Sequence, residues 1–413
     1  MQGSRHARPR TTPLSFLPLV LLAVGLSVLG APAADAARVK RILLVGDSWA
    51  EYPWNWGSFQ DVLDEKAPGQ YAVEGRYTAI GGSPALWWGE NRIFVTDDDP
   101  PGDGPNGSGW GFLDRIDYTL DQYPTIDIIH MSLGGIDLLA TWRNGWQGTQ
   151  DEIDLFNTIH DSVQTVVNHV KSRPDGDRFR FLWCGYDYLN ITETCTYGMS
   201  EYSNDAALSA AALGFTVSFD IFANKANNEV LNRAFGRCAL RKIDLANATP
   251  GLHFIHNFGL MQWRHGYTNS IGTLIAAGLV AFPGQAPDYN PLPGGDPTYG
   301  TAPTRMHDTG DKIDPIHISD ASYKTLFTNC WDQYYSRWLP DATQPTCHAI
   351  NRTEPNPIDE GTVTFSVTFS ESVSGVDVSD FTVDATDLAG AAITGLSGSG
   401  TTYTITATTG TAN

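Results

Sequence analysis

Hydrophobic residues along the chain alternate between short continuous runs and longer stretches with helical spacing. The continuous runs, which are rich in β-branched residues and predict buried strands, are Arg41–Val45, Tyr71–Ile80, Ile126–Leu133, Phe179–Trp183 and Leu252–Ile255. Amphipathic stretches between them, such as Ile153–Val170 and Val230–Ile243, predict helices. Continuous apolar strands separated by helices form a parallel sheet that is covered on both faces. The pattern therefore predicts an α/β protein with its ligand site at the carboxyl ends of the strands.

The pattern changes after Leu339, where a Pro-rich, linker-like stretch covers residues 341–356. Beyond it, Thr362–Phe369, Phe381–Val383 and Tyr403–Thr406 alternate between polar and apolar residues, which predicts antiparallel strands. The stretch "VTFSVTFSESVSGVDVSDFTV" resembles bacterial Ig-like modules. We expect a doubly wound (flavodoxin-like) α/β sandwich over residues 38–340 and a partial all-β Ig-like sandwich over residues 357–413. The second part has about half of the roughly 100 residues of a full Ig sandwich, so we expect the sequence to stop inside the module.

Length and charge narrow the choice of function. A chain of 413 residues favours two domains. The formal net charge of −20 opposes binding to nucleic acid or to an anionic membrane.

The N-terminus has the pattern of an export signal. Arg5, Arg8 and Arg10 precede an apolar stretch from Leu14 to Gly30, and Ala34-Asp35-Ala36 offers a small-x-small cleavage site. A retained membrane anchor is the alternative, although Pro18 interrupts the stretch and it is short for a membrane span. We expect residues 1–36 to be a signal peptide and the mature protein to be secreted or associated with the cell surface.

Five cysteines would then lie in an oxidising compartment. Cys184 with Cys195, and Cys330 with Cys347, are the pairs favoured by nearness in sequence, which leaves Cys238 as the odd one. Their spacing fits no zinc pattern.

Two segments carry residues suited to nucleophilic catalysis. The first strand runs into Gly46-Asp47-Ser48, which is either ordinary turn chemistry or a turn that presents Ser48 as a nucleophile. In "DKIDPIHISD", a carboxylate at Asp314 can orient the imidazole of His317, which can then take the proton of a serine. The alternatives there are a helix N-terminus with His317 merely exposed, and a rival base and acid at His307 and Asp308.

Four blocks in this order resemble the SGNH (GDSL-type) hydrolase family over residues 40 to 340. They are Gly-Asp-Ser after the first strand, a glycine turn in "AIGGSPALWW" after the second, Gly-Gly-x-Asp in "LGGIDLL" after the third, and Asp-x-x-His before the last helix. The resemblance implies Ser48 as nucleophile, His317 as base and Asp314 as the residue that orients the base. It also implies an oxyanion hole made by the backbone N–H groups of Ser48 and Gly82, with Gly81 as a one-residue alternative.

The third block departs from the family pattern of Gly-x-Asn-Asp. Ile136 stands where the family has an asparagine whose amide donates to the oxyanion. Loss of one such donor costs on the order of 10² to 10³ in turnover. Another donor from a nearby loop, at Asn55, Asn91 or Asn144, a slow enzyme, or a binding protein on an esterase scaffold would each account for the change.

Tryptophans follow all three glycine-containing blocks. Trp49 and Trp54 follow the first, Trp87 and Trp88 the second and Trp142 the third. These rings could form a flat platform for sugar rings or aromatic acyl groups, line an acyl pocket, or simply pack within the loops, and the sequence leaves all three open.

No cofactor and no catalytic metal are expected. The Asp-rich loop Thr96–Gly109 has oxygen ligands that calcium accepts, but it lacks the EF-hand spacing, which favours a solvated acidic loop.

The sequence therefore predicts a secreted serine ester hydrolase that acts through an acyl-enzyme on acetylated polysaccharide or other extracellular esters. The alternative is a weak or inactive glycan-binding protein on the same fold. The expected partner is a small-molecule or polymer ester, with no nucleic acid and no membrane insertion after signal cleavage.

Overall fold

The computed structural model describes residues 38–105, 107–194, 228–310, 313–339, 347–354, 361–373, 375–382, 388–409 and 411–412. The predicted signal peptide, Cys195 and much of the predicted linker lie outside these residues. The boundaries of the predicted domains stay predictions.

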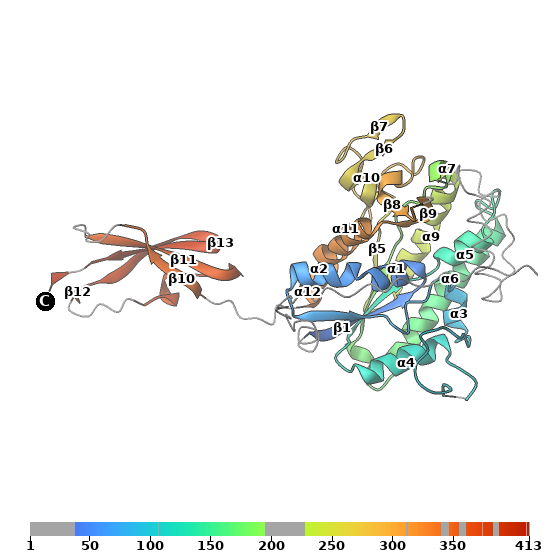
Figure 1. Cartoon of the computed structure of the whole chain (residues 1–413), viewed down its shortest axis with the longest axis horizontal. Coiled ribbons are helices and arrows are strands. Elements are labelled where there is room, and N and C mark those ends of the chain that lie inside the picture. Colours follow the sequence, from blue (N-terminus) through green and yellow to red (C-terminus); the bar gives the residue numbers. More distant parts are fainter. Residues whose placement is uncertain are drawn as a thin grey trace, which may run out of the picture.

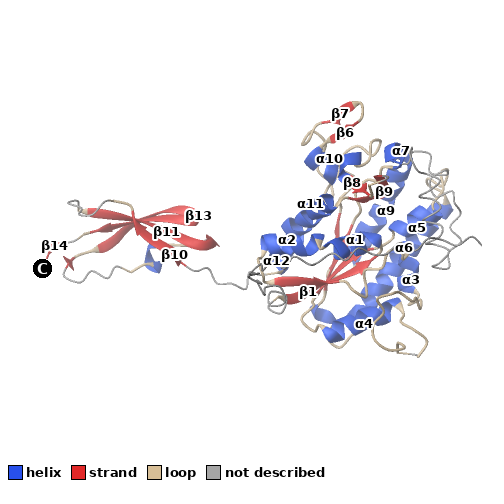
Figure 2. Cartoon of the chain, viewed as in Figure 1, coloured by secondary structure: helices blue, strands red, loops and turns tan. Residues whose placement is uncertain are grey.

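Five parallel strands form the central sheet (Figures 1 and 2). They are β1 (Val39–Gly46), β2 (Tyr71–Glu74), β3 (Ile128–Ser132), β4 (Arg180–Cys184) and β5 (Leu252–Ile255). Their order is β2-β1-β3-β4-β5, the flavodoxin-like order, and every neighbouring pair is parallel. The predicted doubly wound α/β fold is confirmed.

The second strand is shorter than the predicted Tyr71–Ile80. It ends at Glu74, whose side chain accepts hydrogen bonds from the backbone N–H groups of Gly75 and Arg76. This contact turns the chain, and Thr78 and Ala79 then return to the end of β1 at Gly46. The turn brings the glycine pair Gly81-Gly82 to the carboxyl edge of the sheet.

Helices cover both faces of the sheet (Figure 1). On one face, α2 (Ser58–Lys66) packs against α11 (Asp320–Cys330). On the other, α6 (Gln150–Lys171) packs against α4 (Phe112–Gln122) and α9 (Asn228–Ala248). The shorter helices are α1 (Ser48–Trp56), α3 (Ala85–Gly89), α5 (Gly135–Thr141), α7 (Ile191–Thr194), α10 (Leu260–His265) and α12 (Ser336–Trp338). Small strand pairs add β6 (Tyr267–Asn269) with β7 (Gly272–Ile275), and β8 (Met306–Asp308) with β9 (Ile313–Ile318).

The C-terminal part is antiparallel, as the alternating pattern predicts, but the predicted strand at Phe381–Val383 is wrong. A 3₁₀ turn, Val378–Asp380, ends at Phe381, residues 381–382 lie in no strand, and residue 383 lies outside the described residues. Strands β10 (Cys347–Arg352), β11 (Thr362–Val373) and β13 (Ala392–Thr408) form one sheet, and β12 (Leu388–Ala389) pairs with β14 (Thr411–Ala412). This part has its own apolar cluster around Val367, Tyr403 and Ile405. Its Ig-like character stays a prediction.

The expected pairing of Cys330 with Cys347 is wrong. Both are free thiols, Cys347 is exposed, and the Sγ of buried Cys330 lies 3.8 Å from the Sγ of Cys184. Cys330 lies next to Cys184 because the end of α11 packs against the end of β4, and nearness in sequence does not predict this contact. The expected partner of Cys184, Cys195, lies outside the described residues, and Cys238 is a buried free thiol.

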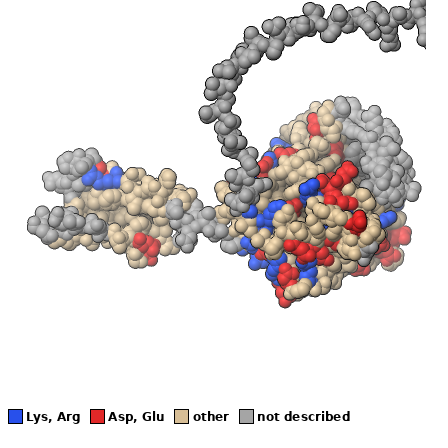
Figure 3. All heavy atoms as spheres, turned by 60° about the horizontal axis from the view of Figure 1, so that its bottom comes forward, with Lys and Arg blue, Asp and Glu red and all other residues tan. Residues whose placement is uncertain are grey.

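The surface carries many acidic side chains. Figure 3 shows Asp and Glu gathered in patches on one face of the α/β part, with Lys and Arg between them. Among the described residues, no helix has the length and apolar character needed to cross a bilayer.

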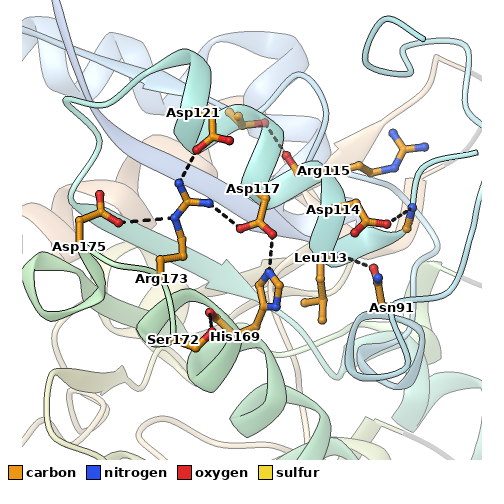
Figure 4. A network of polar contacts seen from close by, with 12 residues as sticks. Asn91, Leu113, Asp114, Arg115, Asp117, Asp121, His169, Ser172, Arg173 and Asp175 are labelled. Carbon is orange, nitrogen blue, oxygen red and sulfur yellow. Dashed lines mark hydrogen bonds and ion pairs between the residues drawn. The ribbon is translucent and has the colours of Figure 1, made fainter. Parts of the chain in front are cut away.

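A network of ion pairs joins α4 to the end of α6 (Figure 4). The Asp117 carboxylate is 2.8 Å from His169 Nε2 and 2.6 Å from Arg173 Nη1, and Arg173 also pairs with Asp121. Burial raises the pKa of Asp117, but the hydrogen bonds from His169 and Arg173 outweigh burial and lower it below its ordinary value. The network therefore stabilises the fold only while Asp117 is ionised.

We expect Asp117→Asn to lower the free energy of unfolding by about 1 kcal/mol at pH 7, since solvent screens this half-buried pair. A lowered carboxyl pKa gives stability above the unfolded-state value, near 4, and the stability is lost as pH falls through the folded-state value. Urea unfolding at pH 7 and pH 3 measures this, with the exposed Asp161→Asn on α6 as control. An equal loss at both pH values would contradict the assignment.

Candidate active site

Ser48 lies at the first position of α1, directly after β1. Asp47 is the N-cap of this helix, and its carboxylate accepts a hydrogen bond from the Trp49 N–H at 3.0 Å. Gly46 has a φ of 153°, and a Cβ there would lie 2.2 Å from the Ser132 carbonyl oxygen of β3. Only glycine fits this close approach, so the Gly-Asp-Ser turn places the serine at the N-terminus of a helix, where the helix dipole favours negative charge.

The structure brings Ser48, His317 and Asp314 into one line of hydrogen bonds. His317 Nε2 is 2.6 Å from Ser48 Oγ, and His317 Nδ1 is 2.6 Å from Asp314 Oδ2. All three side chains are buried. The first and last residues of this line are far apart in the sequence, and the doubly wound topology brings them to the same edge of the sheet.

The segment that carries Asp314 and His317 is strand β9, and not the helix N-terminus that the sequence also allows. Residues three apart on a regular strand face opposite sides. Here Asp314 Oδ1 accepts hydrogen bonds from the N–H groups of Ile316 and His317, so the backbone turns around the carboxylate and the two side chains meet. Burial raises the pKa of Asp314, but the charge of His317 and these hydrogen bonds lower it below its ordinary value.

The rival pair is placed elsewhere. The ring of His307 packs beside Trp56 at 4.8 Å, and the exposed Asp308 accepts a hydrogen bond from the Gly310 N–H. Among the described residues, neither His307 nor Asp308 makes a hydrogen bond to Ser48, although the ring of Tyr52 contacts both His307, at 5.7 Å, and His317.

Two backbone N–H groups remain available near Ser48. Neither the Ser48 N–H nor the Gly82 N–H has a hydrogen-bond acceptor within the part of the chain that the structure describes. The Gly81 N–H, in contrast, donates to the Glu51 carboxylate, and a Cβ on Gly81 would lie 2.1 Å from Glu51 Oε2. This favours Gly82 over Gly81 as the second oxyanion donor.

Ile136 lies at the site and offers no hydrogen bond from its side chain. It lines a small cavity together with Ser48, and no asparagine is among the residues that line this cavity. Asn91 Oδ1 accepts a hydrogen bond from the Leu113 N–H at the start of α4, while Asn55 and Asn144 are exposed. The structure therefore places none of the three expected substitutes at Ser48.

The aspartate of the third block supports the second block. Asp137 accepts hydrogen bonds from the N–H groups of Ala85 and Leu86, at 2.8 Å and 3.4 Å. These are the first residues of α3, which follows the Gly81-Gly82 turn. A buried carboxylate thus caps this helix and ties the two blocks together.

Four of the five tryptophans are too buried to form a flat, open platform. Trp49, Trp87, Trp88 and Trp142 are at most 5% exposed and pack within the core. Trp49 nevertheless lines the small cavity at Ser48. Trp54 alone remains a candidate, because it is half-buried and lines a cavity of about 430 Å³ with Glu51, Asn55 and Gly81. The sequence also missed Tyr52, whose ring lies 4.4 Å from the ring of His317.

Tyr186 is a second residue that the sequence missed. Its hydroxyl donates to Asp47 Oδ2 at 2.6 Å and accepts a hydrogen bond from the Gly135 N–H at 2.8 Å. Burial raises the pKa of Asp47 to about 6, although the hydrogen bonds from Tyr186 and Trp49 act against burial. Tyr186 follows the carboxyl end of β4, and this position in the sequence could have identified it as a candidate site residue.

We expect Tyr186→Phe to lower the free energy of unfolding by about 3 kcal/mol, because it leaves the Asp47 carboxylate and the Gly135 N–H without this partner. Tyr323→Phe is a matched control. Both rings pack edge-on against Trp49, at 5.2 Å and 5.4 Å, but the buried Tyr323 hydroxyl has no hydrogen-bond partner within the described residues. Urea unfolding should show a loss for Tyr186→Phe alone, and equal values for the two variants would refute this role.

In the described part of the chain, no group of three or more His, Cys, Asp or Glu side chains is arranged to hold a metal ion. In the Asp-rich loop, Asp99 forms an ion pair with the buried Arg115 and accepts a hydrogen bond from the Thr96 N–H.

No protein-family model matches the chain, and no curated protein matches it in sequence. Among solved structures, it is similar to a gut microbial diltiazem-metabolizing enzyme, with 11% identity and a TM-score of 0.39 over 80% of this chain. The chain spans 57% of the length of that enzyme. An aryl esterase from M. smegmatis has 12% identity and a TM-score of 0.34, over 72% of this chain and 99% of the esterase.

An extracellular lipase from Streptomyces rimosus has 11% identity and a TM-score of 0.32, over 71% of this chain and 99% of the lipase. With TM-scores below 0.5, none of these similarities bears on the activity of this chain, which we infer from the geometry of the site.

Proposed function

We propose that the chain is a secreted serine ester hydrolase of the SGNH (GDSL) type that works through an acyl-enzyme. The observation that carries the proposal is the line of hydrogen bonds from Asp314 through His317 to Ser48. A serine hydroxyl is a weak nucleophile until a base takes its proton, and this arrangement supplies the base and the group that orients it. Secretion is supported by the charge and apolar pattern of the N-terminal residues.

In the proposed reaction, Ser48 Oγ attacks the ester carbonyl carbon while its proton moves to His317 Nε2. The carbonyl oxygen becomes an oxyanion next to the N–H groups of Ser48 and Gly82. The bond to the alcohol oxygen then breaks, and His317 gives its proton to the leaving alcohol. A water molecule, deprotonated by His317, releases the acid from Ser48 in the same way.

Asp314 keeps a proton on His317 Nδ1 and stabilises the imidazolium. Its lowered pKa fits this role, because a carboxyl group that ionises readily stays negative while the imidazole carries positive charge.

The cavity of about 430 Å³ supports a polymer or sugar ester as substrate. It adjoins Gly81, next to the proposed oxyanion donor, and combines the aromatic rings of Trp54 and Phe94 with the polar groups of Glu51 and Asn55. Aromatic faces beside hydrogen-bonding groups suit a sugar ring. We therefore propose acetylated polysaccharide or a related extracellular ester as the substrate class.

The second candidate is a weakly active or inactive glycan-binding protein on the same fold. The observation that favours it is Ile136, which puts an apolar side chain at the position of a family oxyanion donor.

Labelling with a fluorophosphonate probe separates the two candidates. The purified chain should label, and labelling should vanish in Ser48→Ala and His317→Ala but persist in His307→Ala, which removes a neighbouring histidine outside the line of hydrogen bonds. If the folded wild-type protein does not label, and if it binds glycans with the same affinity as the Ser48→Ala variant, the glycan-binding candidate is favoured. Release of acetate from acetylated glycans would then test the substrate class.

A further inference from the structure

The direction in which the acyl chain of a substrate would lie follows from the site geometry. This inference rests on the proposed function. The reacting carbon is bonded to Ser48 Oγ, its oxygen faces the N–H groups of Ser48 and Gly82, and the leaving oxygen faces His317. The acyl chain takes the remaining direction, and the cavity that Ser48 itself lines is the space next to the reacting atom.

The wall of this cavity is largely apolar. Ile136 and Leu139 come from α5, Leu189 from the segment after β4, Phe235 from α9 and Ile316 from β9. Trp49 from α1 and Tyr186 complete the wall, beside Asp47 and Gly135. A largely apolar wall suits a hydrocarbon chain better than an alcohol or a sugar, whose hydroxyl groups need hydrogen-bond partners.

The cavity is very small. Its volume is about 10 Å³, which is the space of roughly one water molecule. A methyl group is of similar size, so the methyl of an acetyl group fits. A longer acyl chain has to displace the side chains of the wall.

These side chains resist displacement because other buried residues pack against them on the side away from the cavity. Leu139, Leu189 and Phe235 are at most 4% exposed. Tyr186 is fixed by its two hydrogen bonds and packs edge-on against Phe235, with ring centroids 5.9 Å apart. Extra methylene groups forced into a packed core displace side chains from their preferred rotamers and are destabilising.

We propose that the Ser48 site selects acetyl esters, and that Ile136 and Leu139 set this limit on acyl length. Ile136 then has a function of its own. It replaces the family amide donor with the wall that keeps the cavity at the size of one methyl group.

The test compares acyl lengths on one leaving group. The purified chain is given p-nitrophenyl acetate, butyrate and octanoate, and kcat/KM is measured for each. We expect acetate to exceed butyrate by about tenfold or more, since one methylene in an apolar pocket changes kcat/KM by about 10- to 200-fold. Ile136→Ala and Leu139→Ala should each lower the acetate-to-butyrate ratio by at least about tenfold.

Leu138→Ala is the matched control. Leu138 neighbours Leu139 on α5 and is fully buried, but it is not among the residues that line the cavity. Its variant should keep the wild-type ratio even if its stability falls. Ile136 is partly exposed, so its variant is expected to fold where a fully buried residue is less tolerant.

The outcomes are distinguishable from failure of the proposed function. Ester turnover with equal rates on all three chain lengths, or a ratio that neither variant changes, would overturn acetyl selectivity alone. A chain that turns over no ester and does not label with the fluorophosphonate probe would overturn the proposed function and the selectivity with it.

Discussion

Replacing Ser48 with alanine is expected to lower kcat for ester hydrolysis by about 10⁶, and His317→Ala is expected to have the same effect. The double variant should be no slower than either single variant. The reason is the pair of 2.6 Å contacts that makes the three side chains one unit, in which a nucleophile without its base, or a base without its nucleophile, does nothing.

The measurement is kcat on one activated ester for wild type, both single variants and the double variant, with circular dichroism to show that each is folded. Effects that multiply in the double variant would mean that Ser48 and His317 act independently. The proposed acyl-enzyme mechanism would then be wrong.

Replacing Asp314 with asparagine is expected to lower kcat by about 10⁴ while the fold is kept. Asp314 Oδ1 accepts two backbone N–H groups, so the oxygen of an asparagine must stay there. Its NH₂ group then faces His317 Nδ1 and donates to it, which moves the imidazole proton to Nε2. A protonated Nε2 faces Ser48 Oγ and cannot accept its proton.

Asp308→Asn is the control for this change. It makes the same substitution at an exposed residue of the rival pair, where the carboxylate accepts only from the Gly310 N–H among the described contacts. Its kcat should equal that of wild type. If Asp308→Asn lowered kcat as much as Asp314→Asn does, the assignment of Asp314 as the residue that orients the base would be wrong.

The α/β class was predictable because it depends on local patterns, and the resemblance of four short blocks to the SGNH family pointed to Ser48, Asp314 and His317. Buried parallel strands are continuous apolar runs, and Gly46-Asp47-Ser48 directly follows one of them. The prediction for β2 was too long because the apolar pattern continues past Glu74, whose side chain turns the backbone. A side chain that bonds to its own backbone leaves no trace in hydrophobic periodicity.

The exposure of the tryptophan rings, in contrast, could not be predicted from the sequence. Their positions after three strand ends put them near the site in sequence, but Trp88 and Trp142 are fully or almost fully buried and donate hydrogen bonds to Ser83 and Glu152. Sequence position reports which loop a ring is on. Whether the ring faces solvent depends on what packs against it from elsewhere in the chain.

The α/β class, the Gly-Asp-Ser and Asp-x-x-His blocks that carry Ser48, Asp314 and His317, and the isoleucine at position 136 can all be read from the sequence, because each is a property of a short segment. The folded chain is needed to show which of Gly81 and Gly82 has a free N–H, that Tyr186 joins Asp47 to Gly135, that Cys330 faces Cys184, and how small the cavity at Ser48 is. These features depend on contacts between segments far apart in the chain, and such contacts exist only once the sheet is assembled.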